Sequence, residues 1–261
     1  MTNWIPLSTT THATKHYIPR KDYSFAADQQ VVPILIEEIP KLLPHFNLCF
    51  IYEQNTYHPV VLTSLGGNTN LYINHDGKWL APYIPAYLRT HPFRMITSED
   101  NKNLMCILDD YLTDQSNGLP IFDEQGNLTQ PVQDIFDFLH KCDRSLQATK
   151  SACALLDKAG VIEKWPLQIQ QQEGQEPLKI NGLYKISEKA LNELDGKTFA
   201  GLRGNGALAL AYAQIFSMNQ INQLTELSKY HARLKATQQQ KANINPEEIF
   251  GDDDKISFDN I

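Results

Sequence analysis

Continuous apolar runs and turn signals predict several strands in the first half of the chain. Segment 47–53 (NLCFIYE) is an apolar run that ends in charge, which is typical of a strand buried on both faces. Segments 58–66 (HPVVLTSLG) and 104–110 (LMCILDD) predict two more strands, and Asp-Gly between the apolar ends of 71–80 predicts a hairpin. Residues 1–24 are polar and interrupted by prolines, so we expect mostly extended chain on the surface.

Between these regions, residues 31–46 (VVPILIEEIPKLLPHF) carry apolar positions at helical spacing. Pro33 suits the first turn of a helix, Pro40 interrupts the pattern and Pro44 ends it. The segment therefore predicts a short, kinked helix.

From residue 131 the apolar positions step by three and four, which predicts one long amphipathic helix that ends at Gly160. Beyond it we expect a hairpin within 165–186, a short helix capped by Ser187, and a buried helix over 199–217. Ser217 and Gln220 have capping-box spacing before a last helix that begins at Ile221.

Strands in the first half and helices in the second favour an α+β fold over a doubly wound α/β sheet. We predict one compact domain over residues 1–235, in which the strand-rich N-terminal half packs against the long helix and the C-terminal helices. Apolar residues become sparse after residue 236, so residues 236–261 are predicted to form a flexible acidic tail.

The composition of the chain argues against some classes of protein but does not identify a function. The chain is 42% apolar and 10% aromatic, enough for a substantial core. Its net charge of -7 argues against a protein that binds nucleic acid non-specifically, which needs a positive face. No secretory signal opens the sequence and no apolar run approaches the length of a membrane span, so we expect no membrane insertion and a cytoplasmic location.

The four cysteines show no C-x-x-C pairing, and three of them lie within apolar patterns. We therefore expect reduced thiols and no disulfide, as in a cytoplasmic protein. They are Cys49, Cys106, Cys142 and Cys153.

Glycine-rich segments in the second half do not form nucleotide-binding motifs. GKT at 196–198 lacks the earlier glycine of a phosphate loop, since Leu191 stands at that position, and Thr198 is interpreted as a helix cap. Gly201, Gly204 and Gly206 lie within the predicted buried helix, where close packing explains them. No cofactor is predicted.

Histidines are scattered along the first half. His12 and His16 are four apart, but their surroundings do not predict a helix that would aim both at one metal. Folding could bring His58, His75 and His91 together, although nothing in the spacing requires it. We predict no metal site.

The densest group of aromatic and charged residues is YIPAYLRTHPF, residues 83–93. Pro85 and Pro92 limit any helix between them to about one turn. Tyr83, Tyr87 and Phe93 are expected to join Trp79 in one buried aromatic cluster. On this interpretation, Tyr87→Ala would cost about 3 kcal/mol or more of stability.

Arg89 lies on this short element beside aromatic rings, where it could stack, pair with a carboxylate or bind a ligand anion. Glu38 lies nearer than Glu37 to the apolar face of its predicted helix, and its simplest role is a cap or an ion pair at the edge of the core. The stretch is thus either a structural clamp or a binding site. The candidate ligand- or partner-binding residues are Glu38, Trp79, Tyr83, Tyr87, Arg89 and His91.

In their order along the chain, several segments resemble the SapC family, bacterial proteins named after a gene in a surface-layer protein locus. The resemblance covers roughly residues 4–227 and implies no catalytic mechanism and no catalytic residues. The segments that carry it include FAADQQVVPILIEEIPKLLPHFNLCF, YIPAYLRTHPF, IFDEQGNLT, GLYKISEKALNEL and GALALAYAQIFSMNQINQL.

Two functions remain open from the sequence. The first is a cytoplasmic accessory protein that binds a protein partner, in the export or assembly of a surface protein. The second is an enzyme or enzyme subunit with a pocket for a small-molecule or anionic ligand around Arg89, His91 and Glu38.

Overall fold

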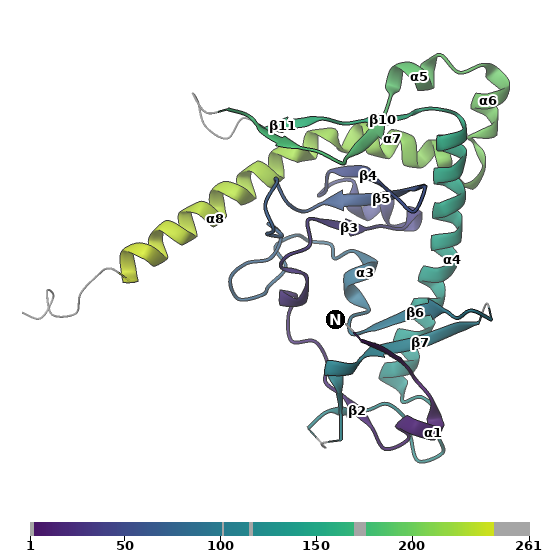
Figure 1. The fold of residues 1–261 in the computed structure, drawn as a ribbon, viewed down its shortest axis with the longest axis vertical. Helices are drawn as coiled ribbons and strands as arrows, with labels where there is room; N and C mark the ends of the chain where they lie inside the picture. Colours follow the sequence, from purple (N-terminus) through teal and green to yellow (C-terminus); the bar gives the residue numbers. More distant parts are fainter. Residues whose placement is uncertain (1–2, 101, 115–116, 170–175, 243–261) are drawn as a thin grey trace, which may run out of the picture.

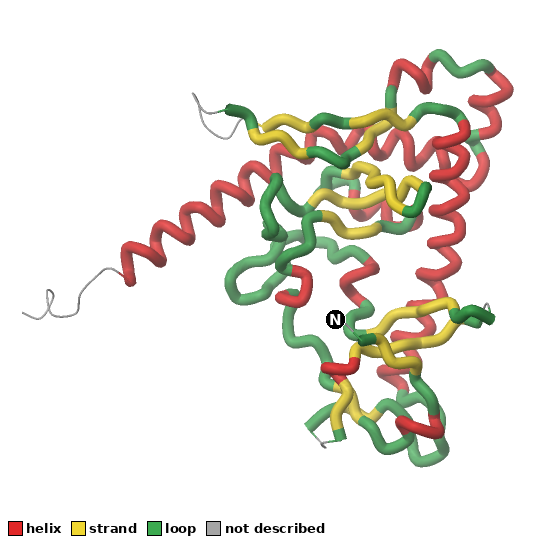
Figure 2. The backbone as a smooth tube through the Cα atoms, in the orientation of Figure 1, coloured by secondary structure: helices red, strands yellow, loops and turns green. Residues whose placement is uncertain are grey.

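A computed structural model describes residues 3–100, 102–114, 117–169 and 176–242. The fold is α+β, as predicted: over these residues the strands form four antiparallel sheets, and the long helix lies along one side of the molecule (Figures 1 and 2). The strands and helices form an upper and a lower group in Figure 1, and the long helix runs along both.

The larger group is built on a five-stranded sheet with the order β10-β13-β4-β5-β3. Its centre is the hairpin of β4 and β5, in which Leu48 pairs with Val61 and Glu53 pairs with Thr56. The start of β4 is buried on both faces, as expected, whereas Tyr52 and Glu53 at its end are exposed. The strands are β3 (Val31–Pro33), β4 (Leu48–Glu53), β5 (Thr56–Leu62), β10 (Ile162–Lys164) and β13 (Tyr184–Ile186).

Beside this sheet lies the predicted hairpin of 165–186, formed by β11 (Leu167–Ile169) and β12 (Leu178–Ile180). The hairpin predicted at 71–80 is reduced to one bridge between Ile73 and Trp79. Its turn is nevertheless in place, because the Asn74 side chain accepts hydrogen bonds from the Asp76 and Lys78 amides.

The smaller group contains two three-stranded sheets, ordered β1-β7-β6 and β8-β2-β9. The first 24 residues contribute a strand to each of these sheets, together with the short helix α1 (Thr9–His12). The remaining strands are β1 (Trp4–Pro6), β2 (His16–Tyr17), β6 (Phe93–Thr97), β7 (Asn103–Leu108), β8 (Leu112–Thr113) and β9 (Leu119–Pro120).

The long helix α4 (Gln130–Lys158) contributes to two hydrophobic cores and confirms the periodicity of its sequence. Val132 and Leu139 pack into the core of the smaller group, whereas Cys153 and Leu156 pack into the core of the larger group. The helix ends before Gly160, whose φ of +68° suits a residue without a side chain.

The segment 31–46 differs from the prediction at its start. Pro33 ends strand β3 instead of opening a helix, and helical structure begins three residues later with a 3-10 turn over Ile36–Glu38. The turn continues into α2 (Ile39–Leu42), where Pro40 occupies the first turn, a position at which no backbone donor is needed.

The buried helix predicted over 199–217 is in fact two helices, α6 (Gly196–Gly201) and α7 (Ala207–Ser217). They are separated at Asn205 and Gly206, which have φ of +53° and +74°. At the start of α6 the capping residue is Asp195, which accepts hydrogen bonds from the Lys197 and Thr198 amides, so the prediction of Thr198 as the cap is wrong.

The last helices also correct two predictions. Ser217 does not cap a new helix, because its buried hydroxyl accepts a hydrogen bond from the Leu48 amide of β4. Helix α8 (Ile221–Ala242) continues through residues 236–242, which were assigned to the tail, and residues 243–261 lie outside the described residues. The remaining helices are α3 (Ala86–Arg89) and α5 (Glu188–Asn192), the latter starting after Ser187 as predicted.

Candidate functional site

Helix α3 is a single turn between Pro85 and Pro92, as the two prolines predicted. Its buried side is made of Ala86 and Leu88, and Leu88 is 0% exposed. Tyr87 points the other way and is 52% exposed, so it does not belong to a buried aromatic cluster. The prediction that Tyr87→Ala is strongly destabilising is therefore wrong in its premise.

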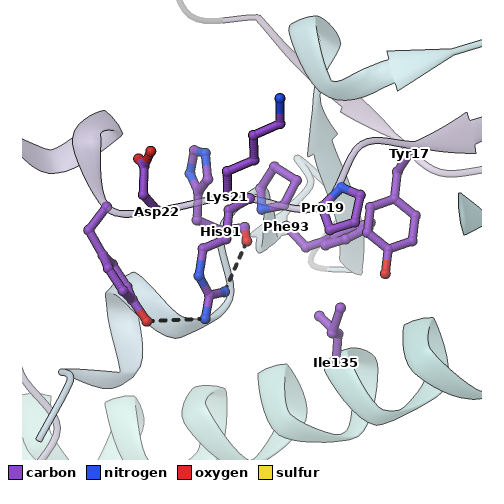
Figure 3. A pocket seen from close by; sticks show the side chains of 10 residues that line it. Tyr17, Pro19, Lys21, Asp22, His91, Phe93 and Ile135 are labelled. Atoms are coloured by element: carbon purple, nitrogen blue, oxygen red, sulfur yellow. Dashed lines mark hydrogen bonds between the residues drawn. The ribbon is translucent and has the colours of Figure 1, made fainter. Parts of the chain in front are cut away.

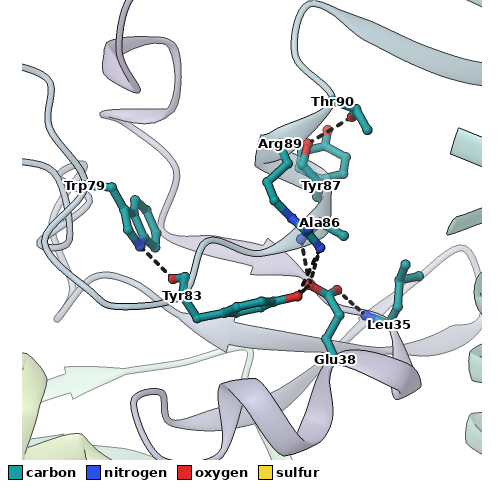
Figure 4. Close-up of polar contacts among 8 residues, drawn as sticks. All are labelled: Leu35, Glu38, Trp79, Tyr83, Ala86, Tyr87, Arg89 and Thr90. Carbon is teal, nitrogen blue, oxygen red and sulfur yellow. Dashed lines mark hydrogen bonds and ion pairs between the residues drawn. The ribbon is translucent and has the colours of Figure 1, made fainter. Parts of the chain in front are cut away.

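The Glu38 carboxylate contacts the amino end of α3. The residue is 5% exposed, and its Oε1 accepts hydrogen bonds from the Ala86 amide at 2.6 Å and the Tyr83 hydroxyl at 2.9 Å (Figure 4). Its Oε2 accepts a bond from the Leu35 amide at 2.9 Å, which caps the 3-10 turn. Burial raises the pKa of Glu38, while these donors and the Arg89 charge oppose the rise.

Arg89 reaches from α3 back toward the same carboxylate (Figure 4). Its Nη2 donates to the Tyr83 hydroxyl at 3.0 Å and lies 4.0 Å from Oε1 of Glu38. Its guanidinium also lies over the Phe138 ring, 4.5 Å from the centroid. Of the roles open to Arg89, the structure shows stacking and pairing with a carboxylate.

Arg20 holds the other end of α3. Its Nη1 donates to the backbone carbonyls of Arg89 and His91, at 2.5 and 3.3 Å, and its Nη2 donates to the Tyr23 hydroxyl at 3.4 Å. A cation is favourable at this position because the carbonyls at the end of a helix carry partial negative charge. Arg20 was missed because the polar, proline-interrupted segment around it has no periodicity that predicts a contact 69 residues away.

The aromatic residues of this region divide between the two cores. Phe93 packs edge-on against Tyr17 in the smaller group, with ring centroids 5.0 Å apart. Trp79 stacks on Tyr72 in the larger group, and its Nε1 donates to the Tyr83 carbonyl at 2.8 Å. The single aromatic cluster predicted from the sequence is therefore not formed.

His91 follows α3 and is held by aromatic rings. It stacks on Phe25, with centroids 3.6 Å apart, and meets Tyr111 edge-on. Burial and then the charge of Arg20 lower the pKa of His91 to about 4, so the ring is neutral near pH 7.

A pocket of about 370 Å³ opens beside His91 (Figure 3). Ile135 of α4 lies below it, with Tyr17 toward one end and Asp22 toward the other. Neither Glu38 nor Arg89 is among its lining residues, although the enzyme hypothesis grouped them with His91 around one pocket. The structure therefore brings Glu38, Tyr83 and Arg89 together, and places His91 in a separate pocket.

The other histidines considered as metal ligands, apart from His16, contact near neighbours in the sequence. His12 is buried in α1 and accepts a hydrogen bond from the Ser8 amide at 3.1 Å, whereas His58 bonds Thr56 and His75 pairs with Asp76. In the part of the chain that the structure describes, no group of three or more His, Cys, Asp or Glu residues could hold a metal ion. Over the same ranges, no helix is both long and apolar enough to cross a membrane.

All four cysteines are free, and none has the properties of an activated nucleophile. Burial raises the pKa of Cys49 and Cys153 to about 12. Cys142 has a pKa raised to about 11 by burial and by the Glu38 carboxylate, while the Arg89 charge opposes the rise.

Comparison with known proteins identifies the family. No curated protein and no solved structure shows significant similarity to the chain. The family model described as SapC matches residues 7–224, which include α3, both residues that hold its ends, and the pocket beside His91. The chain therefore belongs to the SapC family.

Proposed function

We propose that the chain is an accessory protein that binds a partner protein, with Tyr87 on α3 as an anchor of the binding surface. One observation carries the proposal: an exposed tyrosine lies on a single helical turn whose two ends are both fixed by charged side chains. Glu38 binds the amide at the start of α3, and Arg20 binds the carbonyls at its end.

The energetic argument concerns pre-organisation. One isolated turn of helix is unstable in water, so α3 depends on the contacts at its ends and on Leu88 beneath it. A fixed tyrosine loses little conformational freedom when it binds, and tyrosine is enriched among the residues that dominate interface energies. The contacts of Glu38 and Arg20 therefore support a role in presenting Tyr87.

We further propose that the partner acts in the export or assembly of a surface protein and that the complex forms in the cytoplasm. Membership of the SapC family, whose name derives from a surface-layer protein locus, supports the first part. Four free cysteines support the second, because thiols persist in a reducing compartment.

The enzyme alternative receives less support. The Glu38 carboxylate is occupied by donors from its own chain, and Arg89 is directed at it and at the Phe138 ring. Of the three residues assigned to that site, only His91 lines the pocket.

Photo-cross-linking in the source cell tests the proposal. A photoreactive phenylalanine analogue replaces Tyr87 in one variant and Tyr52 in a matched control, since Tyr52 is also an exposed tyrosine, at 45%, but lies on β4. We expect a discrete cross-linked protein from position 87 and not from position 52. The same pattern of products from both positions, or none from position 87, would contradict the proposal.

A further inference from the structure

The pocket beside His91 lies where the two hydrophobic cores meet. Tyr17, Phe93 and Ile135 on its walls belong to the core of the smaller group, whereas Tyr23 packs against the core of the larger group. Its volume of about 370 Å³ lies within the range of small-molecule sites. Junctions between packed units are places where such sites commonly occur.

The charge on the pocket walls is positive. Arg20 is half-buried, and it forms no ion pair with any residue that the structure describes. Its guanidinium donates to two carbonyls and the Tyr23 hydroxyl, and it lies over the Tyr23 ring, 5.2 Å from the centroid. Lys21 adds a second cation on an exposed, flexible stem. Asp22 is the single acidic lining residue, and its Oδ1 accepts a hydrogen bond from the Ser24 amide at 2.8 Å, which lowers the pKa of Asp22. Asp22 therefore offsets one of the two cations, and the lining keeps one net positive charge.

Arg20 is partly removed from water and has no carboxylate partner among the described residues, so a negative charge near its guanidinium would be favourable. Carbonyl dipoles compensate Arg20 only in part, and the neutral His91 ring adds no negative charge. The Nε2 atom of His91 is buried and has no hydrogen-bond partner among the described residues. An anion bound in the pocket would supply the opposite charge that Arg20 lacks.

We propose that this pocket binds a small organic anion, a carboxylate or phosphate carried on an apolar or aromatic body. The anionic group faces Arg20 and Lys21, and the body lies against Tyr17, Phe93 and Ile135. The ligand bridges the two cores and so stabilises their relative position. This site is distinct from the exposed face of Tyr87, and either one can exist without the other.

The test uses the full chain labelled with ¹³C and ¹⁵N in histidine, observed by NMR. The His91 signals are assigned by their loss in His91→Phe, and phenyl phosphate and benzoate are then titrated against the neutral analogue benzyl alcohol. We expect saturable shifts of the His91 signals with both anions and no saturable shift with the alcohol. Equal responses to all three probes, or none to the anions, would overturn the proposal.

A titration with inorganic phosphate measures how much the apolar walls contribute to the affinity. We expect it to bind more weakly than phenyl phosphate by at least about tenfold, since it cannot use the aromatic side of the pocket. Equal affinities would show that the walls contribute nothing and would overturn the assignment of an organic anion.

Two substitutions locate the anionic group. Lys21→Gln should weaken phenyl phosphate binding about threefold, and Arg20→Lys, which loses the planar fork, about tenfold. The matched control is Lys189→Gln, an exposed lysine on α5, which should leave the affinity unchanged. Melting temperatures of all variants show whether Arg20→Lys still folds; unchanged affinity in folded Lys21→Gln and Arg20→Lys would overturn the site.

Discussion

Two charged residues of opposite sign determine the conformation of the candidate site. Glu38 binds the amino end of α3 and Arg20 binds its carboxyl end. Each sign matches the partial charge of the helix end that it contacts, so both contacts are stabilising. Arg89 adds a cation next to Glu38, which offsets part of the free-energy cost of burying that carboxylate.

Removing Glu38 should therefore be costly. Glu38→Ala leaves the Ala86 and Leu35 amides without their acceptor and Arg89 without its counter-ion. We expect the free energy of unfolding to fall by about 2–4 kcal/mol, mainly because buried donors lose their acceptor. Glu37→Ala is the matched control, an exposed neighbour that should change stability by about 0.5 kcal/mol or less. Urea unfolding measures both, and similar losses in the two variants would contradict the role of Glu38.

Alanine substitutions at two adjacent positions of α3 should differ strongly in their cost in stability. Leu88 is fully buried, so Leu88→Ala should cost about 2–5 kcal/mol. Tyr87 is exposed, so Tyr87→Ala should cost about 0.5 kcal/mol or less. Thermal unfolding of the two variants compares them directly, and a large loss in Tyr87→Ala would show that its ring is buried in solution.

His91 should make stability depend on pH. Its pKa is about 4 in the folded protein and 6.5 ordinarily, so between these values the unfolded chain binds a proton that the folded protein does not. The free energy of unfolding should therefore fall as pH drops through this range. His91→Phe keeps an aromatic ring against Phe25 but has no group that titrates. Between about pH 7 and pH 4 this variant should lose about 1–2 kcal/mol less stability than the unaltered chain, a difference that allows for the partial exposure of the His91 ring. Denaturant unfolding at about pH 7 and pH 4 measures this, and parallel pH profiles would rule it out.

Among the elements, those with a strong local pattern were predicted and those fixed by distant contacts were not. The periodicity of 130–158 was sufficient to predict α4 and its end at Gly160. The break between α6 and α7 was missed although Asn205-Gly206 is a turn signal, because the glycines were attributed to close packing within one helix. Pro33 was placed in a helix because its pairing with Val60 of β5 cannot be recognised from the neighbouring residues alone.

Gly206 should tolerate substitution poorly. Its φ is +74°, and a Cβ atom there would lie 2.5 Å from Cδ1 of Ile36. We expect Gly206→Ala to cost about 1–3 kcal/mol, with the lower value if the end of the Ile36 side chain moves aside. Gly204 offers the control, since a Cβ atom there would meet nothing within 4 Å. A smaller loss in Gly206→Ala than in Gly204→Ala would contradict the described break.

For the whole molecule, the architecture explains why the site could be predicted only in part. The sequence indicated Glu38, Tyr83 and Arg89 as candidates, but their assembly depends on contacts such as that between Glu38 and Ala86, 48 residues apart. The same holds for Arg20 and the pocket, which lie where two cores meet along α4. The single domain over residues 1–235 stays a prediction, although α4 contributes buried residues to both cores.

The most direct test of the account is the affinity of the protein captured by cross-linking for three forms of the full chain, measured by isothermal titration calorimetry. We predict that Tyr87→Ala weakens binding at least about tenfold while its melting temperature stays unchanged, since truncating an anchoring tyrosine typically costs more than 1 kcal/mol. Tyr52→Ala should bind like the unaltered chain. Unchanged affinity in Tyr87→Ala, or an equal loss in Tyr52→Ala, would contradict the claim that α3 presents Tyr87 to a partner.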